Sequence, residues 1–178
     1  MMSPRCLIGK PYNTQLAGTT MNTVSATNSP AFLRTPTLAD AAAIARLADE
    51  LGYSASASMI EDRLARLLPL DRHFLRVAEN SQRVVVGWLH AAEEDLLESG
   101  RRCEILGLVV AATTRGQGIG RALVAAAEAW ATQCGLPQMS VRSNTRREET
   151  HSFYLGLGYT QTKTQHVYRK RLPGGRAG

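Results

Sequence analysis

The sequence has no apolar run long enough to cross a membrane. Its longest uninterrupted stretch covers residues 105–112, whereas a membrane-spanning helix needs roughly 20 apolar residues. Residues 1–29 also lack acidic side chains, a continuous apolar segment and the small-residue cleavage site of a secretory signal. We therefore expect a cytoplasmic protein in which residues 1–29 are a flexible extension, unless translation starts at Met21.

Cysteine is scarce, and the pattern of the three cysteines argues against a zinc protein and against a thiol enzyme. Cys6, Cys103 and Cys134 form neither a CxxC pair nor a zinc-like spacing with histidine. We therefore expect no metal and a reducing compartment. Cys103 has no histidine and aspartate partners at a spacing that suggests a thiol enzyme, so a structural cysteine is the expected assignment.

The chain is large enough for one ordinary globular domain, which we place at residues 30–173, with 174–178 as a tail. It has 178 residues, 44% of them apolar, and a formal net charge of +6. The basic excess gathers at Arg115, Arg121, Arg142, Arg146, Arg147 and residues 169–171. Such a cluster fits a polyanionic small ligand or a solvated surface. Nucleic acid is not the expected partner, because no helix-turn-helix or aromatic RNA-binding signature is present.

A glycine-rich turn is the most informative motif in the chain. Residues 115–120 read Arg-Gly-Gln-Gly-Ile-Gly and connect the apolar run 105–110 to the alanine-rich amphipathic stretch 122–131. Glycine removes the Cβ that blocks close approach, and the first N–H groups of a helix have no intrahelical partner. This strand, loop and helix sequence predicts a site for a phosphate or pyrophosphate.

Two common phosphate-binding classes do not fit this turn. A dinucleotide fingerprint needs a third glycine where Arg121 stands, and an acidic residue about 20 positions on. A P-loop needs Gly-Lys-Ser/Thr, which occurs nowhere in the chain. The ligand is therefore neither a dinucleotide of the Rossmann class nor a nucleoside triphosphate.

Hydrophobic periodicity predicts an α/β fold: a single-domain mixed sheet, mostly antiparallel and flanked by helices. Helices are expected at residues 37–51, 58–68, 118–134 and 148–157, the first two opened by capping boxes at Thr37 with Asp40 and at Ser58 with Glu61. Strands are expected at residues 32–34, 73–78, 84–92, 102–111, 138–142 and 160–172. Short turns join the middle strands into a meander, and the helix at 118–134 leads to a parallel strand.

The segments on both sides of the turn extend the motif. The turn resembles the Arg/Gln-x-x-Gly-x-Gly/Ala acetyl-CoA loop of the GNAT superfamily of N-acyltransferases. It lies within CEILGLVVAATTRGQGIG, and the later SNTRREETHSFYLGLGY is similar to that family's Asn…Phe-Tyr-x-x-x-Gly-Tyr/Phe segment. The resemblance covers about residues 103–160. It implies transfer of an acetyl group from acetyl-CoA, as co-substrate, to a primary amine by direct attack in a ternary complex.

The resemblance also implies which residues hold coenzyme A. The pantetheine arm would pair with the strand residues Leu108, Val109 and Val110, which are also expected to be buried sheet. The pyrophosphate would meet the loop at Arg115, Gly116, Gln117, Gly118, Ile119, Gly120 and Arg121. Asn144 matches the side chain that fixes coenzyme A, although it stands ten residues before Tyr154, a longer spacing than is usual in that family.

Two residues are implied in the chemistry. Glu104 stands where some family members carry a catalytic glutamate that takes the proton of the amine, directly or through water. A strand glutamate paired with an arginine or facing solvent is the alternative. Tyr154 matches the tyrosine that gives its proton to the departing thiolate, and the alternative is a core aromatic. His151 is expected to orient Tyr154 or cap a neighbour, whereas His73, His90 and His166 receive no role.

The acceptor is not determined by the sequence. A small-molecule amine is favoured and a protein amine is left open, as is a homodimer. The resemblance implies that the early helices, with Tyr53 and the 52–58 loop, line the acceptor pocket. Two other functions remain as alternatives: a non-catalytic acyl-CoA sensor or scaffold, and a basic nucleic-acid binder.

Overall fold

The computed structural model describes residues 31–173, and the extension and tail predicted at residues 1–29 and 174–178 lie outside this range. The chain separates into two compact units, one up to Val141 and one from Arg142 onward. Each is described by itself. No helix in the described range is both long and apolar enough to span a bilayer.

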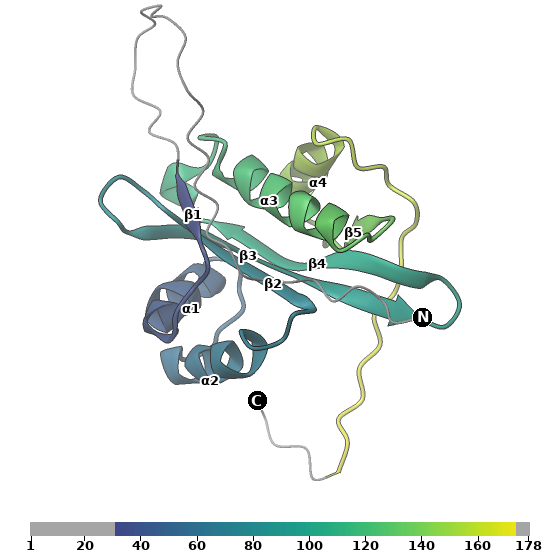
Figure 1. The fold of residues 1–178 in the computed structure, drawn as a ribbon, viewed down its shortest axis with the longest axis horizontal. Helices are drawn as coiled ribbons and strands as arrows, with labels where there is room; N and C mark the ends of the chain where they lie inside the picture. Colours follow the sequence, from purple (N-terminus) through teal and green to yellow (C-terminus); the bar gives the residue numbers. More distant parts are fainter. Residues whose placement is uncertain (1–30, 174–178) are drawn as a thin grey trace, which may run out of the picture. The chain divides into compact units, whose positions relative to one another are not determined.

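The first unit is built on a five-stranded mixed sheet (Figure 1). Its strands, in spatial order, are β1 (Phe32–Arg34), β2 (His73–Glu79), β3 (Val85–Leu96), β4 (Gly100–Val110) and β5 (Met139–Val141). The first four pair antiparallel, and β4 and β5 pair parallel. The predicted meander, the parallel crossover and the fold class are therefore confirmed.

Asn80 shapes the turn between β2 and β3, as predicted. Its Oδ1 accepts hydrogen bonds from the N–H groups of Gln82 and Val84, both at 3.0 Å. This local bonding replaces ladder pairing across the turn. The next connection is tighter than expected, because β3 continues to Leu96 and β4 begins at Gly100, whose φ of 73° favours glycine.

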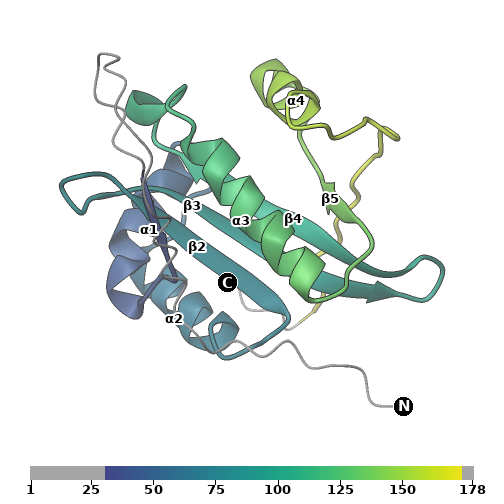
Figure 2. The ribbon, with the colours of Figure 1, turned by 45° about the horizontal axis from the view of Figure 1, so that its top comes forward.

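Helices cover both faces of this sheet (Figures 1 and 2). The 3-10 turn η1 (Leu38–Asp40) leads into α1 (Ala41–Asp49), which lies with α2 (Ala57–Leu67) on one face, here called the α1/α2 face. α3 (Ile119–Gln133) lies on the other face, where Trp130 stacks on Phe74 of β2 with ring centroids 5.4 Å apart. The core of the α1/α2 face contains Ala41, Ile44, Ala45, Leu47, Ile60, Leu64, Val77, Val85 and Val109.

The start of α2 differs from the prediction. Ser56, rather than Ser58, caps the helix, because its Oγ accepts the Met59 N–H at 3.2 Å. Ser58 already lies inside the helix, and its hydroxyl is 2.9 Å from that of Ser56. Two serines at i and i+2 offer similar caps in the sequence, and the extended backbone of Ser56 decides between them.

The second unit contains α4 (Glu148–Leu155), as predicted. The strand expected at residues 160–172 is wrong, because this segment has no regular structure and is exposed along its length. Its apolar residues Val167, Tyr168 and Leu172 are 74%, 88% and 68% exposed. An alternating pattern forms a strand only where a partner buries one face, and no described strand pairs with this segment.

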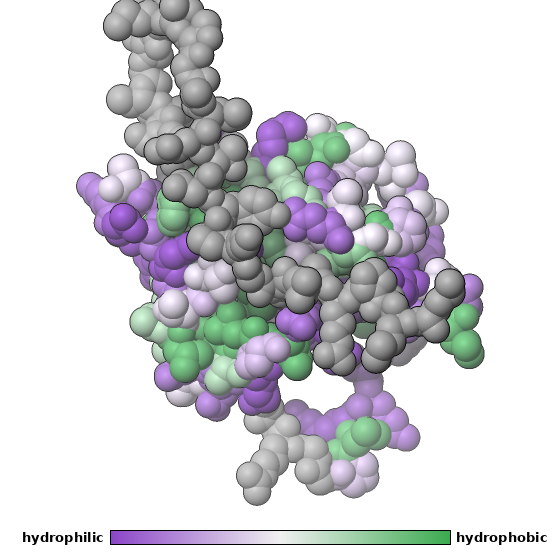
Figure 3. Space-filling model, viewed as in Figure 1, coloured by the Kyte–Doolittle hydropathy of each residue, from purple (hydrophilic) through white to green (hydrophobic). Residues whose placement is uncertain are grey.

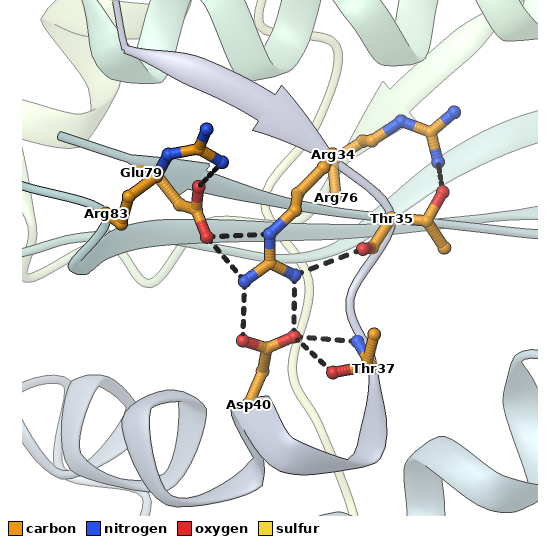
Figure 4. A network of polar contacts seen from close by, with 7 residues as sticks. All are labelled: Arg34, Thr35, Thr37, Asp40, Arg76, Glu79 and Arg83. Carbon is orange, nitrogen blue, oxygen red and sulfur yellow. Dashed lines mark hydrogen bonds and ion pairs between the residues drawn. The ribbon is translucent and has the colours of Figure 1, made fainter. Parts of the chain in front are cut away.

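A buried ion network fixes β1 and α1 to the sheet (Figure 4). Arg34 of β1 binds both Asp40 oxygens at 2.7 Å through Nη1 and Nη2, and donates Nε to Glu79 Oε1 at 2.7 Å. Asp40 and Glu79 are only 8% and 5% exposed. Asp40 also accepts the Thr37 N–H at 2.7 Å. One guanidinium therefore pairs with two buried carboxylates, from η1 and β2, and Arg83 adds a second positive charge 3.8 Å from Glu79 Oε2.

Arg34→Ala is expected to lower the free energy of unfolding by about 3 kcal/mol, because removing one partner of a buried ion pair leaves the other charges uncompensated. Urea denaturation at pH 7 measures this loss. Arg66→Ala, at an exposed position of α2, is the matched control. Equal effects of the two substitutions would contradict the assigned role of the network.

The same network predicts a dependence of stability on pH. The Arg34 guanidinium lowers the pKa of Asp40 from 3.8 to about 2, against the opposing effect of burial. A lowered carboxyl pKa contributes stability that is complete above the unfolded-state value and is lost as the pH falls toward 2. We expect wild type to lose unfolding free energy more steeply than Asp40→Asn between pH 4 and 2. Denaturation curves with parallel pH dependence would refute this.

Candidate functional site

The glycine-rich turn forms an exposed loop that ends at the N-terminus of α3. Gly116 and Gly118 have φ values of 76° and 81°, and no atom lies within 4 Å of a Cβ built on either. Gly118 is the N-cap of α3, whose first intrahelical bond runs from the Ala122 N–H to the Gly118 carbonyl. The N–H groups at residues 119–121 precede that bond and sit at the positive end of the helix dipole. The loop therefore suits an anion.

Strand β4 loses its pairing with β5 well before it reaches the glycine loop. β5 pairs only with Cys103, Glu104 and Ile105. A bulge follows at once, because Ile105 pairs with Ala91 while Gly107 pairs with His90, which leaves Leu106 as the extra residue. Residues 108–110 then pair with β3 alone within the described range, and on their other edge the Val110 carbonyl accepts Arg115 Nε at 3.5 Å.

Glu50 connects α1 to this region. Its Oε2 accepts the N–H of Ala112 at 3.0 Å, at the turn η2 (Ala112–Thr114) between β4 and the glycine loop. On the same turn, the Thr114 hydroxyl donates to the Ala111 carbonyl at 3.2 Å. Arg115 and Arg121 are both exposed. The two bonds hold the approach to the loop, and the arginines add positive charge around it.

Glu104 lies on the α1/α2 face and is only 3% exposed. Its Oε2 accepts from Arg102 Nη2 at 3.1 Å and from the Ser140 hydroxyl at 3.5 Å. Arg102 also pairs with Glu94 at 3.0 Å. The alternative of an arginine-paired strand glutamate is therefore observed, and it does not conflict with a role in chemistry because the carboxylate is held in place.

Cys103 points to the opposite face of β4 from Glu104. It is fully buried, and burial raises its pKa to about 12, with nearby Glu104 adding to the effect. A thiol with such a pKa stays protonated at neutral pH and is a poor nucleophile. This agrees with the structural assignment expected from the sequence.

Two histidines also lie on the α1/α2 face, close to Glu104 in the strand register. His73 Nδ1 and His90 Nε2 are 3.0 Å apart, and the two rings are half-buried. Burial lowers the pKa of both, that of His90 to about 4. The pair is therefore neutral at pH 7. Its contact was not predicted, because two isolated histidines carry no signal until the register of the hairpin is known.

Tyr154 and Asn144 lie in the second unit. Tyr154 is 7% exposed, and burial raises its pKa to about 12, so the phenol keeps its proton at neutral pH. The rings of Phe153 and Tyr159 meet it edge-on. Asn144 Oδ1 accepts the Arg146 N–H at 3.0 Å, and its carbonyl accepts from His151 Nε2 at 3.1 Å. His151 thus caps its neighbour, one of the two expectations for it.

The region of α1 and α2 shows apolar surface bordered by charged side chains (Figure 3). Tyr53 in the connection between the two helices is 65% exposed, and Leu38 and Leu70 are 42% and 39% exposed. These residues lie on the elements that the sequence predicts to contact the acceptor. Their exposure is consistent with a binding surface there but does not identify its ligand.

Within the described residues, the sheet has one parallel pair and a bulged central strand, and a glycine loop opens a helix, an arrangement that fits a CoA-dependent acetyltransferase. A profile of the Acetyltransferase (GNAT) family matches residues 42–159. The chain belongs to the GNAT acetyltransferase family.

Relatives and solved structures agree with this assignment. Aminoalkylphosphonate N-acetyltransferase of Salmonella typhimurium is 34% identical over 116 residues, covering 65% of this chain and 73% of that protein. AAC(6')-Iy bound to a CoA bisubstrate analogue has a TM-score of 0.71 at 20% identity, covering 81% of this chain and 100% of the other. A transcriptional regulator from Bacillus halodurans C-125 has a TM-score of 0.70 at 23% identity, covering 79% and 99%. The two structures support the fold.

Gly118→Ala is expected to weaken acetyl-CoA binding by about tenfold, roughly 1.4 kcal/mol, because alanine disfavours the positive φ that sets the first N–H groups of α3. Isothermal titration calorimetry measures the dissociation constant. Gly100→Ala carries the same backbone strain at the β3–β4 turn, with φ 73° and no atom within 4 Å, and should bind as wild type does. Similar losses in both variants would show that the loop has no special role.

Proposed function

We propose that the protein transfers the acetyl group of acetyl-CoA to a small primary amine by direct attack in a ternary complex. The observation that carries this proposal is the arrangement of β4. One continuous strand bears the buried carboxylate of Glu104 and, past the bulge, the unpaired edge at residues 108–110. A proton acceptor and a binding edge for an extended cofactor thus belong to one rigid element.

The chain's own groups fit coenzyme A. The N–H groups at residues 119–121 and the exposed arginines Arg115 and Arg121 suit a pyrophosphate. The edge at residues 108–110 has no strand partner among the described residues and suits the amide groups of a pantetheine arm, as an added strand, once Arg115 Nε releases the Val110 carbonyl. Acetyl-CoA supplies an acetyl thioester as co-substrate. Asn144 is assigned to the same ligand from the sequence motif.

Glu104 and Tyr154 share the proton transfers in this proposal. Glu104 holds the acceptor ammonium and takes its proton, directly or through water, so that the amine nitrogen can form the bond to the acetyl carbon. Tyr154 gives its phenolic proton to the departing thiolate. Support comes from its place in the family motif; the phenol carries its proton at neutral pH, and burial raises its pKa to about 12.

The charged side chains around Glu104 favour one kind of acceptor. Two carboxylates, Glu94 and Glu104, surround one guanidinium, Arg102, and the neighbouring histidine pair is neutral. This excess of negative charge favours an acceptor whose reacting end is an ammonium. The relative that acts on aminoalkylphosphonates supports a small molecule as the acceptor, so aminoalkylphosphonates belong in the screen with diamines and aminoglycosides.

An acceptor screen tests the proposal. The release of free CoA thiol from acetyl-CoA is followed with each amine of the panel, and acetylated product is identified by mass spectrometry. Turnover with at least one amine is expected. A protein that binds acetyl-CoA but acetylates no member of the panel, nor lysine peptides, would favour the alternative of a non-catalytic acyl-CoA sensor.

Glu104→Gln and Tyr154→Phe are each expected to lower kcat by about tenfold or more at neutral pH, because each removes a proton-transfer group. Steady-state kinetics on the best acceptor measures the loss. Glu98→Gln in the β3–β4 turn and Tyr168→Phe in the exposed C-terminal segment are the matched controls. Unchanged turnover of Tyr154→Phe at every pH would remove its role as the acid.

A further inference from the structure

The hydrogen-bonded pair His73 and His90 has no role in the chemistry described so far. The bond joins His73 Nδ1 to His90 Nε2 at 3.0 Å, with ring centroids 5.2 Å apart. No described residue makes a hydrogen bond to the other nitrogen of His90, Nδ1. Nε2 of His90 is thus held by His73, whereas Nδ1 of His90 can exchange a proton.

The strand register places this pair beside Glu104. Ala92 of β3 pairs with His73 on one side and with Glu104 on the other. His90, two residues before Ala92, projects from the same face and is therefore a diagonal neighbour of both. Diagonal neighbours in a regular ladder have Cβ atoms roughly 7–8 Å apart; here the Leu106 bulge adds one residue between Gly107 and Glu104, and the proposal places one water molecule between His90 and Glu104.

A small residue separates His73 from Glu104. Ala92 lies between the two in the strand register, and Gly107 is the partner of His90 on β4. A Cβ at Gly107 would come within 2.7 Å of the Trp88 ring, so the indole packs directly over that glycine. Ala92 and the Trp88 ring therefore border the three polar side chains on the face where the acceptor is proposed to bind.

We propose that His90 receives the proton that leaves the acceptor ammonium, and that His73 is a positioning residue that fixes the tautomer of His90. The proposal rests on the proposed function. The ammonium gives one proton to Glu104 or its bound water, and that proton passes to Nδ1 of His90. The amine nitrogen keeps the electron pair for the acetyl carbon. After attack the nitrogen loses its second proton, which replaces the one that Tyr154 gave to the thiolate, and the imidazolium returns the first proton to solvent, so protons and charge balance.

The bond to His73 sets His90 up for this step. When Nε2 of His90 carries its hydrogen and donates to Nδ1 of His73, Nδ1 of His90 has a free electron pair. Burial keeps the imidazole neutral at pH 7, with a pKa of about 4. The charged groups around the pair are Arg72 before β2, Glu94 on β3, Arg102 and Glu104 on β4, and the half-buried Arg63 of α2.

His90→Gln tests the proton transfer, because the glutamine amide keeps a donor near the Nε2 position but has no protonatable nitrogen. At pH 7 we expect kcat to fall about a hundredfold, as for loss of a general base. The loss should shrink to about threefold near pH 10, where the acceptor amine arrives without its proton. The acetyl-CoA dissociation constant should not change.

Two substitutions of His73 test positioning. The Oδ1 atom of Asn can accept the bond from His90 as Nδ1 of His73 does, so His73→Asn should retain most of the turnover. His73→Leu removes the acceptor, and its kcat should fall at pH 7 with the same recovery at high pH. His166→Gln, in the exposed C-terminal segment, is the control and should match wild type.

The outcomes separate the proposals. A loss in His90→Gln that is equal at all pH values, or wild-type kinetics in that variant, overturns the proton role of His90 alone. Equal kcat values for His73→Asn and His73→Leu overturn the positioning role. A wild type that binds acetyl-CoA but acetylates no amine overturns the proposed function together with this inference. Recovery at high pH with unchanged acetyl-CoA binding supports the inference.

Discussion

The parallel pairing of β4 with β5 over only three residues is the constraint on which the site depends. Where β5 pairs, at Cys103 to Ile105, β4 is ordinary buried sheet. Beyond the Leu106 bulge, the same strand has one edge without a described partner. A longer parallel ladder would saturate the main-chain groups that can bind an extended ligand, and a shorter one would leave Glu104 without the Ser140 contact. In the proposed function, the strand therefore combines structural and binding roles.

Two polar arrangements hold the helices that border this strand. The Arg34 network ties η1 and β1 to β2, and Glu50 at the end of α1 reaches the turn before the glycine loop. Because α1 contributes much of the core of its sheet face, these contacts link the packing of that face to the geometry of the loop. Buried charges are costly unless paired, and here each carboxylate of the network has a cationic partner.

The two faces of the sheet carry different side chains. Alternation along β4 sends Cys103 and Ile105 toward α3, and Glu104 toward α1 and α2. The histidine pair shares the second face. The α3 side packs Trp130 on Phe74, whereas the α1/α2 side carries Glu104 and the histidine pair, groups suited to the proposed proton transfer from a bound amine.

The sequence alone determined the order of the elements, the glycine loop and the family, because these depend on local periodicity, on glycine at positive φ and on the spacing within one segment. It also placed Glu104 on a central strand. Arg102, two residues before Glu104 on β4, shares its face by alternation. Only the tertiary structure decided that Ser140 and the histidine pair lie on the side of that carboxylate, because they come from other strands, whose register no local pattern sets. The same reason explains the wrong strand at 160–172: no described strand pairs with this segment, and its apolar residues are exposed.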